Sequence, residues 1–365
     1  MSLSIGIVGL PNVGKSTLFN ALTNKSVPAE NFPFCTIDPS VGGVAVPDER
    51  LNQLSRFSKS EKTIPAAVEF VDIAGLVQGA SAGEGLGNKF LSNIREVDVI
   101  AEVVRMFDDP NIAHVSGEVD PLSDIEVINL ELIMADLETV TNRLSNIERD
   151  IKKGDKTAIV ERDALVEIEH ILTKGTLASS FNLPENAKIA VRNLHLLTTK
   201  PILYVLNKKT DSINIDKLDD GRYQRLKDFL ESTNASWVEI DAGVESELRD
   251  VAPEDKDEFR REFSVFDDGV NALIRKGYKM LNLITFFTTG EDETRGWTIH
   301  CGSTAPEAGS AIHNDFKNKF IRATVISTNT LLDAGSYGTA REKGLVQTEG
   351  KEYIVKDGDV IEFKI

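Results

Sequence analysis

Four short apolar segments, separated by stretches with helical periodicity, organise the first two thirds of the chain. They are Ser4–Gly9, Ala67–Asp72, Val97–Val104 and Pro201–Asn207. Their apolar residues are nearly continuous rather than alternating, which is typical of strands that are covered on both faces. Because these strands alternate with helical sequence, we predict an α/β fold with a mainly parallel sheet and helices on both sides.

The hydrophobic pattern changes to a helical repeat after Asp124. Apolar residues then recur alternately three and four positions apart, at Leu130, Ile133, Leu137, Val140, Leu144, Ile147 and Ile151. A shorter stripe follows the turn at Gly154-Asp155 and consists of Leu165, Ile168 and Leu172. Heptad stripes of this kind are typical of coiled-coil helices. We therefore predict an antiparallel helical hairpin inserted over residues 124–200, with the two stripes packed on each other rather than on a partner.

Short strands with glycine-rich turns dominate the last part of the chain. The candidate strands are Leu283–Thr288, Trp297–His300, Ala323–Ile326, Tyr353–Val355 and Val360–Ile365, with one candidate helix at Pro306–Phe316. Many short strands with few helices predict a compact α+β module over residues 282–365. The remaining residues, 1–123 and 201–281, are assigned to the α/β domain that the hairpin interrupts.

Composition and charge limit the surroundings in which the chain can work. It has 365 residues, 41% of them hydrophobic, and a formal net charge of −17. So acidic a chain is not expected to coat nucleic acid or an anionic membrane, and RNA contact would need a local basic face. The sequence has no apolar run long enough to span a bilayer, and the first strand begins without a basic leader. Cys35 and Cys301 lack metal-ligand spacing, which suits free thiols in the cytoplasm.

The segment Gly9–Ser16 carries the pattern G-x-x-x-x-G-K-[ST] between the first strand and an amphipathic stretch. Backbone N–H groups of such a loop surround a polyphosphate, and the following helix adds the partial positive charge of its N-terminus. We expect Lys15 to reach the outer phosphates and Ser16 to offer its hydroxyl to Mg²⁺. The predicted nucleotide-binding residues of this loop are Asn12, Val13, Gly14, Lys15, Ser16 and Thr17.

A second motif, Asp72-Ile73-Ala74-Gly75, ends the second strand segment. A carboxylate at the C-terminal end of a parallel strand faces the ligand crevice, so Asp72 is predicted to hold the Mg²⁺ shell. Gly75 is expected to offer its N–H to the γ-phosphate. Thr36, between the two motifs, is a candidate Mg²⁺ ligand that senses the γ-phosphate, and an ordinary turn is the alternative.

These motifs resemble those of the Obg family of translation-factor-class P-loop NTPases. The similarity rests on Gly9–Ser16, Phe32–Ile37 and Asp72–Val77, and residues 111–121 with the helical insert are similar to the YchF branch. Residues 297–326 with Asp357-Gly358-Asp359-Val360 resemble a TGS domain, a ubiquitin-like β-grasp module. The resemblance covers nearly the whole chain and implies an ATP-hydrolysing, ribosome-associated protein of the cytosol.

Leu76 occupies the position at which many related GTPases carry a glutamine that orients the attacking water. Leucine has no polar group, so another residue, a monovalent cation or a partner must assist, and we expect slow intrinsic turnover. The resemblance points to His114, whose neutral imidazole can accept a proton from water near pH 7. His114 joins Lys15 and Gly75 as the predicted catalytic set. Asn12 is a candidate ligand for K⁺ bridging the phosphates, and stabilising the turn is its alternative role.

The base-recognition motif departs from the pattern of GTP-selective relatives. They carry Asn-Lys-x-Asp, in which the Asp pairs with guanine, whereas this chain has Asn207-Lys208-Lys209-Thr210. Losing such a charge-assisted pair costs on the order of 3 kcal/mol, so a strong guanine preference is not expected. YchF relatives usually carry Glu at this fourth position and resemble ATP enzymes. This chain departs from both patterns, so we favour ATP, with relaxed specificity left open. Asn207 is expected to bond the base or hold the phosphate loop, and the stem of Lys208 to lie against the purine. Ala242 belongs to a candidate last base-contact loop.

Basic residues gather in the C-terminal module. They are Lys317, Lys319, Arg322, Arg341, Lys343 and Lys351. We interpret them as a face for RNA or for the ribosome, with the large subunit preferred, and a solvated surface is the alternative. The leading hypothesis is a Mg²⁺-dependent, ribosome-binding ATPase that acts as a conformational switch in translation or stress regulation. The alternatives are a GTPase or dual-specificity NTPase of the same fold, and a nucleotide-gated regulatory binding protein with incidental hydrolysis.

Overall fold

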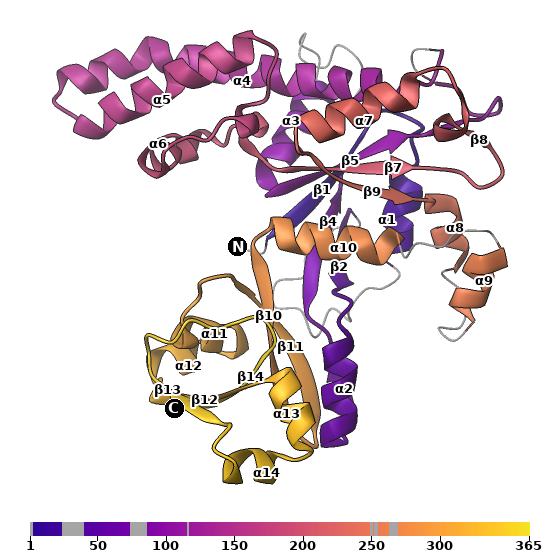
Figure 1. Ribbon diagram of the computed structural model, residues 1–365. Helices are drawn as coiled ribbons and strands as arrows, with labels where there is room; N and C mark the ends of the chain where they lie inside the picture. Colours follow the sequence, from indigo (N-terminus) through magenta and orange to yellow (C-terminus); the bar gives the residue numbers. More distant parts are fainter. Residues whose placement is uncertain are drawn as a thin grey trace.

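The computed structural model describes residues 3–23, 40–73, 86–114, 117–248, 251, 255–262 and 269–365. It contains two six-stranded sheets and a helical arm (Figure 1). The first sheet has the order β2-β4-β1-β5-β7-β9. Its strands are β1 (Ser4–Val8), β2 (Val41–Ala45), β4 (Ala67–Asp72), β5 (Val99–Arg105), β7 (Ile202–Asn207) and β9 (Ser236–Ile240). All neighbouring pairs are parallel except β2 with β4, so the predicted mainly parallel sheet is confirmed.

Helices cover both faces of this sheet. On one face, α1 (Lys15–Thr23) and α10 (Gly269–Met280) pack on its apolar side chains, and on the other face lie the first turns of α4 (Pro121–Lys152) and α7 (Arg222–Ser232). The remaining helices of this part are α3 (Leu86–Glu96), α8 (Ala242–Glu247), α9 (Lys256–Glu262) and the 3₁₀ turn η6 (Ile215–Lys217). Burial on both sides explains why the strands read as continuous apolar runs. The sequence did not reveal the strands β2 and β9.

The helical arm consists of α4, α5 (Lys156–Thr173) and α6 (Glu185–Val191). The chain returns from it to the sheet through the 3₁₀ turns η3 (Ala178–Ser180), η4 (Arg192–Leu194) and η5 (Leu197–Thr199). Asp120 caps α4 by accepting from the N–H groups of Leu122 and Ser123, and Gly154 has a φ of +88° at the turn to α5. The buried carboxylate of Asp136 on α4 accepts from Thr198 N–H and Oγ1, which fixes α4 to the turn η5 that precedes β7.

The predicted seam between the two stripes is confirmed for most of its members. Residues Ile133, Val140, Ile147, Leu165, Ile168 and Leu172 are buried in one cluster, with Leu137, Leu144 and Ile151 packed against it. Leu130 is the exception, because its residue is 58% exposed. Its neighbours Ile128 and Leu132 pack in the core of the sheet, and α4 contributes to the seam of the hairpin only from Ile133 onward.

The second sheet has the order β13-β12-β14-β10-β11-β3. Its strands are β3 (Lys62–Ile64), β10 (Leu283–Thr289), β11 (Glu293–His300), β12 (Arg322–Ser327), β13 (Gln347–Glu349) and β14 (Asp359–Lys364). Its helices are α11 (Ala305–Ile312), α12 (Asn314–Asn318), α13 (Thr328–Ala334) and α14 (Tyr337–Glu342). The predicted strand at Tyr353–Val355 is wrong, because this stretch makes only an isolated bridge between Ile354 and Thr304. The single predicted helix is divided at His313, whose backbone is extended.

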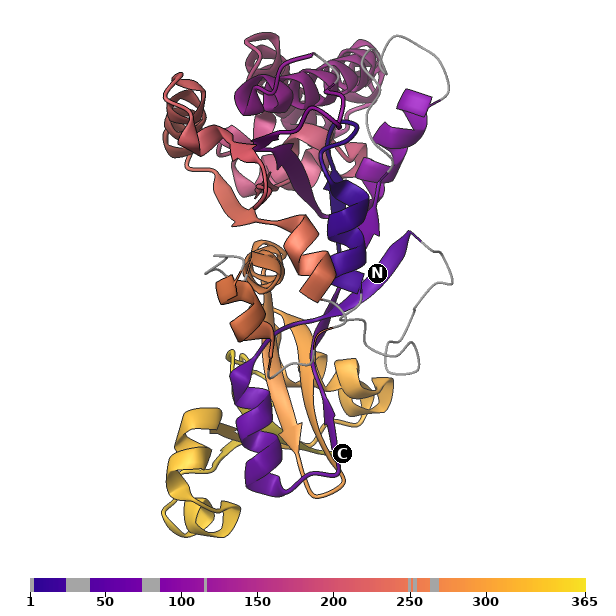
Figure 2. The ribbon, with the colours of Figure 1, turned by 90° about the vertical axis from the view of Figure 1, so that its right-hand side faces the viewer.

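One segment from the N-terminal part lies on this second sheet. The helix α2 (Glu49–Ser58) packs beside β10 and β11, as Figure 2 shows, and β3 pairs in parallel with β11. Leu51 and Leu54 share a buried cluster with Phe287 and Leu331. Residues 49–64 therefore tie the C-terminal module to the nucleotide-binding part of the chain. A two-residue ribbon also joins β6 (Phe107–Asp108) to β8 (Ile213–Asn214).

Candidate nucleotide-binding site

The glycine-rich loop connects β1 directly to α1. Gly9 and Gly14 have φ values of +154° and +97°, and Asn12 has a φ of +63°. A Cβ atom on Gly14 would lie 2.4 Å from Nδ2 of Asn207, so both the backbone angle and the space require glycine there. The Gly14 carbonyl accepts from Leu18 N–H at 2.9 Å, which starts α1 immediately after the loop. The N-terminus of α1 therefore faces the position expected for phosphates.

Lys15 is held inside this loop. Its Nζ donates to the carbonyl oxygen of Leu10 at 2.6 Å. Burial lowers the pKa of Lys15 to about 8, although the negative charge of Asp72 opposes the shift. Burial also raises the pKa of Asp72, and Lys15 opposes that shift. The structure thus brings together the two predicted residues that are far apart in sequence, at the carboxyl ends of the neighbouring strands β1 and β4.

Ser16 and Asp72 are hard oxygen donors of the type that Mg²⁺ prefers. Ser16 lies in the first turn of α1, and Asp72 is the last residue of β4, paired in register with Ile7 of β1. Its pairing with Ile7, two residues before Gly9, places this carboxylate at the start of the phosphate loop, where the charge of Lys15 acts on it. The residues present therefore fit a magnesium ion shared with a nucleotide. The predicted residues Thr36, Gly75 and Leu76 lie outside the described residues.

Asn207 joins the loops around the expected base position. Its Nδ2 donates to the Val13 carbonyl at 2.8 Å, and its Oδ1 accepts from Ala242 N–H at 3.0 Å. One buried side chain thus fixes the phosphate loop to both base-side loops. The Ala242 N–H is used by Asn207, so a contact from Ala242 to a base would come from its side chain.

Lys208 is held by two acidic side chains. Its Nζ lies 2.7 Å from Glu239 and 3.1 Å from Asp216. Burial opposes the charged form, but the two carboxylates outweigh it and raise the pKa of Lys208. The aliphatic stem is therefore anchored at its charged end.

The fourth position of the base motif is closed by a carboxylate. Thr210 donates to Oδ2 of Asp241 through both its N–H and its Oγ1, each at 2.7 Å. The other oxygen of Asp241 accepts from Val244 N–H at 3.0 Å and so caps α8. Asp211, the nearest acidic residue in sequence, is exposed. Sequence reasoning missed Asp241: its position before a short helix suggests a cap, but its pairing with Thr210 depends on the fold.

The segment that carries His114 lies against the phosphate loop. Asn12 Nδ2 donates to the carbonyl oxygen of Ala113 at 3.2 Å. The His114 ring itself is buried, with Nε2 at 3.0 Å from Oδ2 of Asp124 on α4. Burial raises the pKa of Asp124, while His114 opposes that shift. The structure thus places His114 near the site but turned toward a carboxylate that the sequence did not single out.

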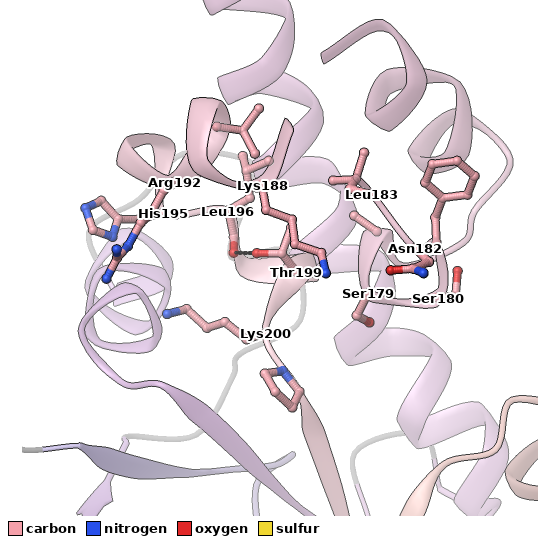
Figure 3. A pocket seen from close by; sticks show the side chains of 14 residues that line it. Ser179, Ser180, Asn182, Leu183, Lys188, Arg192, His195, Leu196, Thr199 and Lys200 are labelled. Atoms are coloured by element: carbon pink, nitrogen blue, oxygen red, sulfur yellow. Dashed lines mark hydrogen bonds between the residues drawn. The ribbon is translucent and has the colours of Figure 1, made fainter. Parts of the chain in front are cut away.

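A separate cavity of about 600 Å³ opens in the helical arm (Figure 3). Lys188, Arg192, His195 and Lys200 are among its lining residues. The Lys200 ammonium already donates to the carbonyl oxygens of Arg95 and Val97. None of the predicted nucleotide-site residues lines this cavity.

The six basic residues predicted to form a face on the C-terminal module are all exposed. They are spread along the chain from α12 to the segment between β13 and β14, and α12 and α14 lie at different ends of the module in Figure 1. Lys319 pairs with Asp315, and Arg341 pairs with Glu362. Across the described ranges, no helix combines the length and the apolar character needed to cross a membrane.

A phosphate loop between β1 and α1, a strand-end aspartate on the neighbouring strand and base-side loops after β7 and β9 define a P-loop NTPase. The chain belongs to the YchF family of these proteins. It is 48% identical to the ribosome-binding ATPase YchF of Bacillus subtilis and 46% identical to that of Escherichia coli O157:H7, in both cases over 100% of this chain and 99% of the relative.

The family profiles and a solved structure agree with this assignment. Residues 4–160 match the MMR_HSR1 family, described as 50S ribosome-binding GTPase, and residues 283–365 match the YchF-GTPase_C family, described as a protein of unknown function. The structure of the Schizosaccharomyces pombe YchF GTPase superposes with a TM-score of 0.87 at 35% identity, covering 100% of this chain and 98% of the other. The predicted P-loop fold, helical insert and C-terminal module are confirmed.

Proposed function

We propose that the protein hydrolyses ATP with Mg²⁺ and uses the resulting conformational change on the ribosome. The observation that carries the hydrolytic part is the convergence of Lys15, Ser16 and Asp72 at one end of the sheet. The names of the bacterial relatives, ribosome-binding ATPases at 46–48% identity over full length, support the substrate and the partner.

Each residue of the phosphate site has a definite task in this proposal. Lys15 leaves the Leu10 carbonyl and pairs with the outer phosphates, and the loop N–H groups bind the phosphate oxygens. Ser16, Asp72 and Thr36 would hold the Mg²⁺, which neutralises charge that builds on the phosphates. Gly75 would donate its N–H to the γ-phosphate.

His114 is proposed to assist the attacking water, because Leu76 has no group to do so. To act, its ring must leave Asp124 and turn toward the phosphate loop, which Ala113 already contacts. Breaking this buried contact before each turnover supports the expectation of a slow basal rate. Asn12 is the proposed K⁺ ligand: its Nδ2 is bound to Ala113, which leaves its Oδ1 as the oxygen for a cation.

ATP is the proposed substrate because Thr210 is closed onto Asp241 and offers no carboxylate to guanine. Dual specificity is the second candidate, since the anchored Lys208 stem can lie against either purine and the S. pombe relative is described as a GTPase. Asn207 and Ala242 would then shape the base pocket without reading the base.

We propose the domain division 1–123 with 201–281, 124–200 and 282–365, with residues 49–64 bridging to the last domain through β3 and α2. The exposed basic residues of residues 282–365 are the proposed contact with RNA of the large ribosomal subunit. We propose that a conformational change at the nucleotide site is transmitted to these basic residues through residues 49–64.

The proposal is tested by turnover measured with ATP and GTP, with and without ribosomes, in KCl and in NaCl. We expect slow Mg²⁺-dependent ATP turnover that ribosomes stimulate. His114→Ala should reduce turnover while ATP affinity is kept, and His195→Ala, in the helical arm, is the control. Tight ATP binding without turnover under any of these conditions would instead favour a nucleotide-gated binding protein.

A further inference from the structure

Arg105 is a fully buried cation at the end of β5, 1% exposed. Its guanidinium donates to three carbonyl oxygens of the following loop: Phe107 O at 2.9 Å, Ile112 O at 3.2 Å and Asp109 O at 3.5 Å. It also lies over the Phe107 ring, with Cζ 4.7 Å from the centroid. Burial lowers the pKa of Arg105, and the negative charges of Asp108, Asp109 and Asp124 oppose that shift. The guanidinium therefore stays a buried cation whose hydrogen bonds all go to the backbone of one loop.

The loop that Arg105 holds leads to His114. Its end contacts the phosphate loop, since Asn12 Nδ2 donates to Ala113 O at 3.2 Å. The next residue, His114, meets Asp124. The contact to Ile112 O lies one residue before Ala113, so the guanidinium fork fixes the backbone immediately before these two contacts.

The same loop is joined to the base side of the site. Met106 N–H donates to Asn207 O at 2.9 Å, and Ile215 N–H donates to Met106 O at 2.7 Å. The Asp109 carboxylate lies 2.5 Å from Nζ of Lys209. One short segment, 106–114, thus contacts the base motif at its beginning and the phosphate loop at its end.

We propose that Arg105 is a positioning residue for hydrolysis, which sets the backbone of residues 107–112 so that His114 is placed at the phosphate loop. This inference rests on the proposed role of His114. Because Lys209 of the base motif pairs with Asp109 of the same loop, a shift of the base motif would also move this loop. Arg105 acts through the backbone that it holds and through its charge near Asp124, the partner of His114.

Arg105→Lys tests this role, because lysine keeps the charge but loses the planar fork that serves three carbonyls. Arg95→Lys, on α3, is the matched control. The Arg95 guanidinium also donates to two backbone carbonyls, those of Leu194 and His195, but these belong to the helical arm and not to the loop before His114. We expect Arg105→Lys to lower kcat for ATP by about tenfold, since small misplacements near a reacting group are costly. The Kd for ATP should change less than about twofold, and the control should keep both values.

A double variant separates positioning from general loosening. If Arg105 acts through His114, Arg105→Lys has no further effect on kcat in a His114→Ala background. An equal loss of kcat in both backgrounds, or an unchanged kcat in Arg105→Lys, overturns the inference while the proposed function stands. Unchanged turnover in His114→Ala alone instead removes the proposed role of His114, and this inference with it.

Lys209→Met provides a second test that leaves the buried guanidinium intact, for use if Arg105→Lys does not fold. It removes the pair with Asp109 on the loop. We expect Lys209→Met to lower kcat about threefold in the wild-type background. It should leave kcat unchanged in the His114→Ala background. If Lys209→Met and wild type had the same kcat, the Asp109–Lys209 pair would not influence the placement of His114. That result would overturn this part of the inference.

Discussion

The side-chain amide of Asn207 donates to the carbonyl oxygen of Val13 across 2.8 Å and lies directly over Gly14. This contact joins residues 194 positions apart in sequence. It explains why the first residue of an altered base motif is still asparagine: its task here is to hold the phosphate loop, which does not depend on the base.

Gly14→Ala should abolish nucleotide binding. The new Cβ would lie 2.4 Å from Asn207 Nδ2 and would force the loop and the amide apart. Gly154→Ala is the matched control, because Gly154 also has a positive φ but has no atom within 4 Å of its would-be Cβ. We expect the control to lose about 1 kcal/mol of unfolding free energy from backbone strain, with ATP affinity unchanged. Calorimetric titration with ATP and urea unfolding measure the two effects, and equal ATP affinity in both variants would contradict the steric argument.

The pKa of Lys15 predicts how ATP affinity depends on pH. In the free protein this pKa is lowered to about 8 by burial, and phosphate binding favours the charged form. Affinity should therefore be constant below about pH 8 and fall above it, by up to about tenfold per pH unit. Lys15→Arg stays charged throughout, so its affinity, whatever its value, should be flat from pH 7.5 to 9.5. A flat wild-type profile over this range would rule out a titrating Lys15.

Restoring an acidic residue in the base motif should not by itself create a guanine site. In Thr210→Asp the new carboxylate would face Asp241, which now accepts both Thr210 donors, and the like charges would repel. The double variant Thr210→Asp/Asp241→Asn removes this repulsion. We expect only the double variant to raise GTP affinity relative to ATP, by about tenfold, measured by competition binding. A gain of the same size in the single variant would show that Asp241 does not close this position.

Glu102 makes unfolding stability depend on pH. Its carboxylate is buried at the centre of β5 without a hydrogen-bond partner among the described residues, and burial, with Asp124, raises its pKa well above 4.5. The folded state therefore retains a proton that the unfolded state releases, so stability is lost as pH rises above about 4.5. Glu102→Gln should be more stable than wild type at pH 8 and should lose less stability between pH 5 and pH 8. Urea unfolding at both pH values tests this, with the exposed Glu126→Gln as control. Parallel pH profiles for Glu102→Gln and wild type would contradict it.

The local patterns were sufficient for the elements that carry strong periodicity or a motif. Continuous apolar runs identified β1, β4, β5 and β7, and the heptad stripe identified the arm. The strands β2 and β9 were not predicted because Val41–Ala45 contains two glycines, and because Ser236–Ile240 is only five residues long and neither continuously apolar nor regularly alternating. The position of α2 and β3 on the second sheet could not be predicted from their own residues, because the sequence of a short strand does not specify which strand it pairs with.

By itself, the sequence determined the phosphate loop, the order of the parts and the absence of an acidic fourth residue in the base motif. These features depend on residue type and spacing along a few consecutive positions. Only the tertiary structure decided that Asn207 donates to Val13, that Asp241 accepts from Thr210 and that Arg105 donates to the carbonyl oxygen of Ile112. Such contacts join side chains to backbone atoms or to residues of other loops. Every residue has a carbonyl oxygen, so the sequence does not show which of them accepts a given side chain.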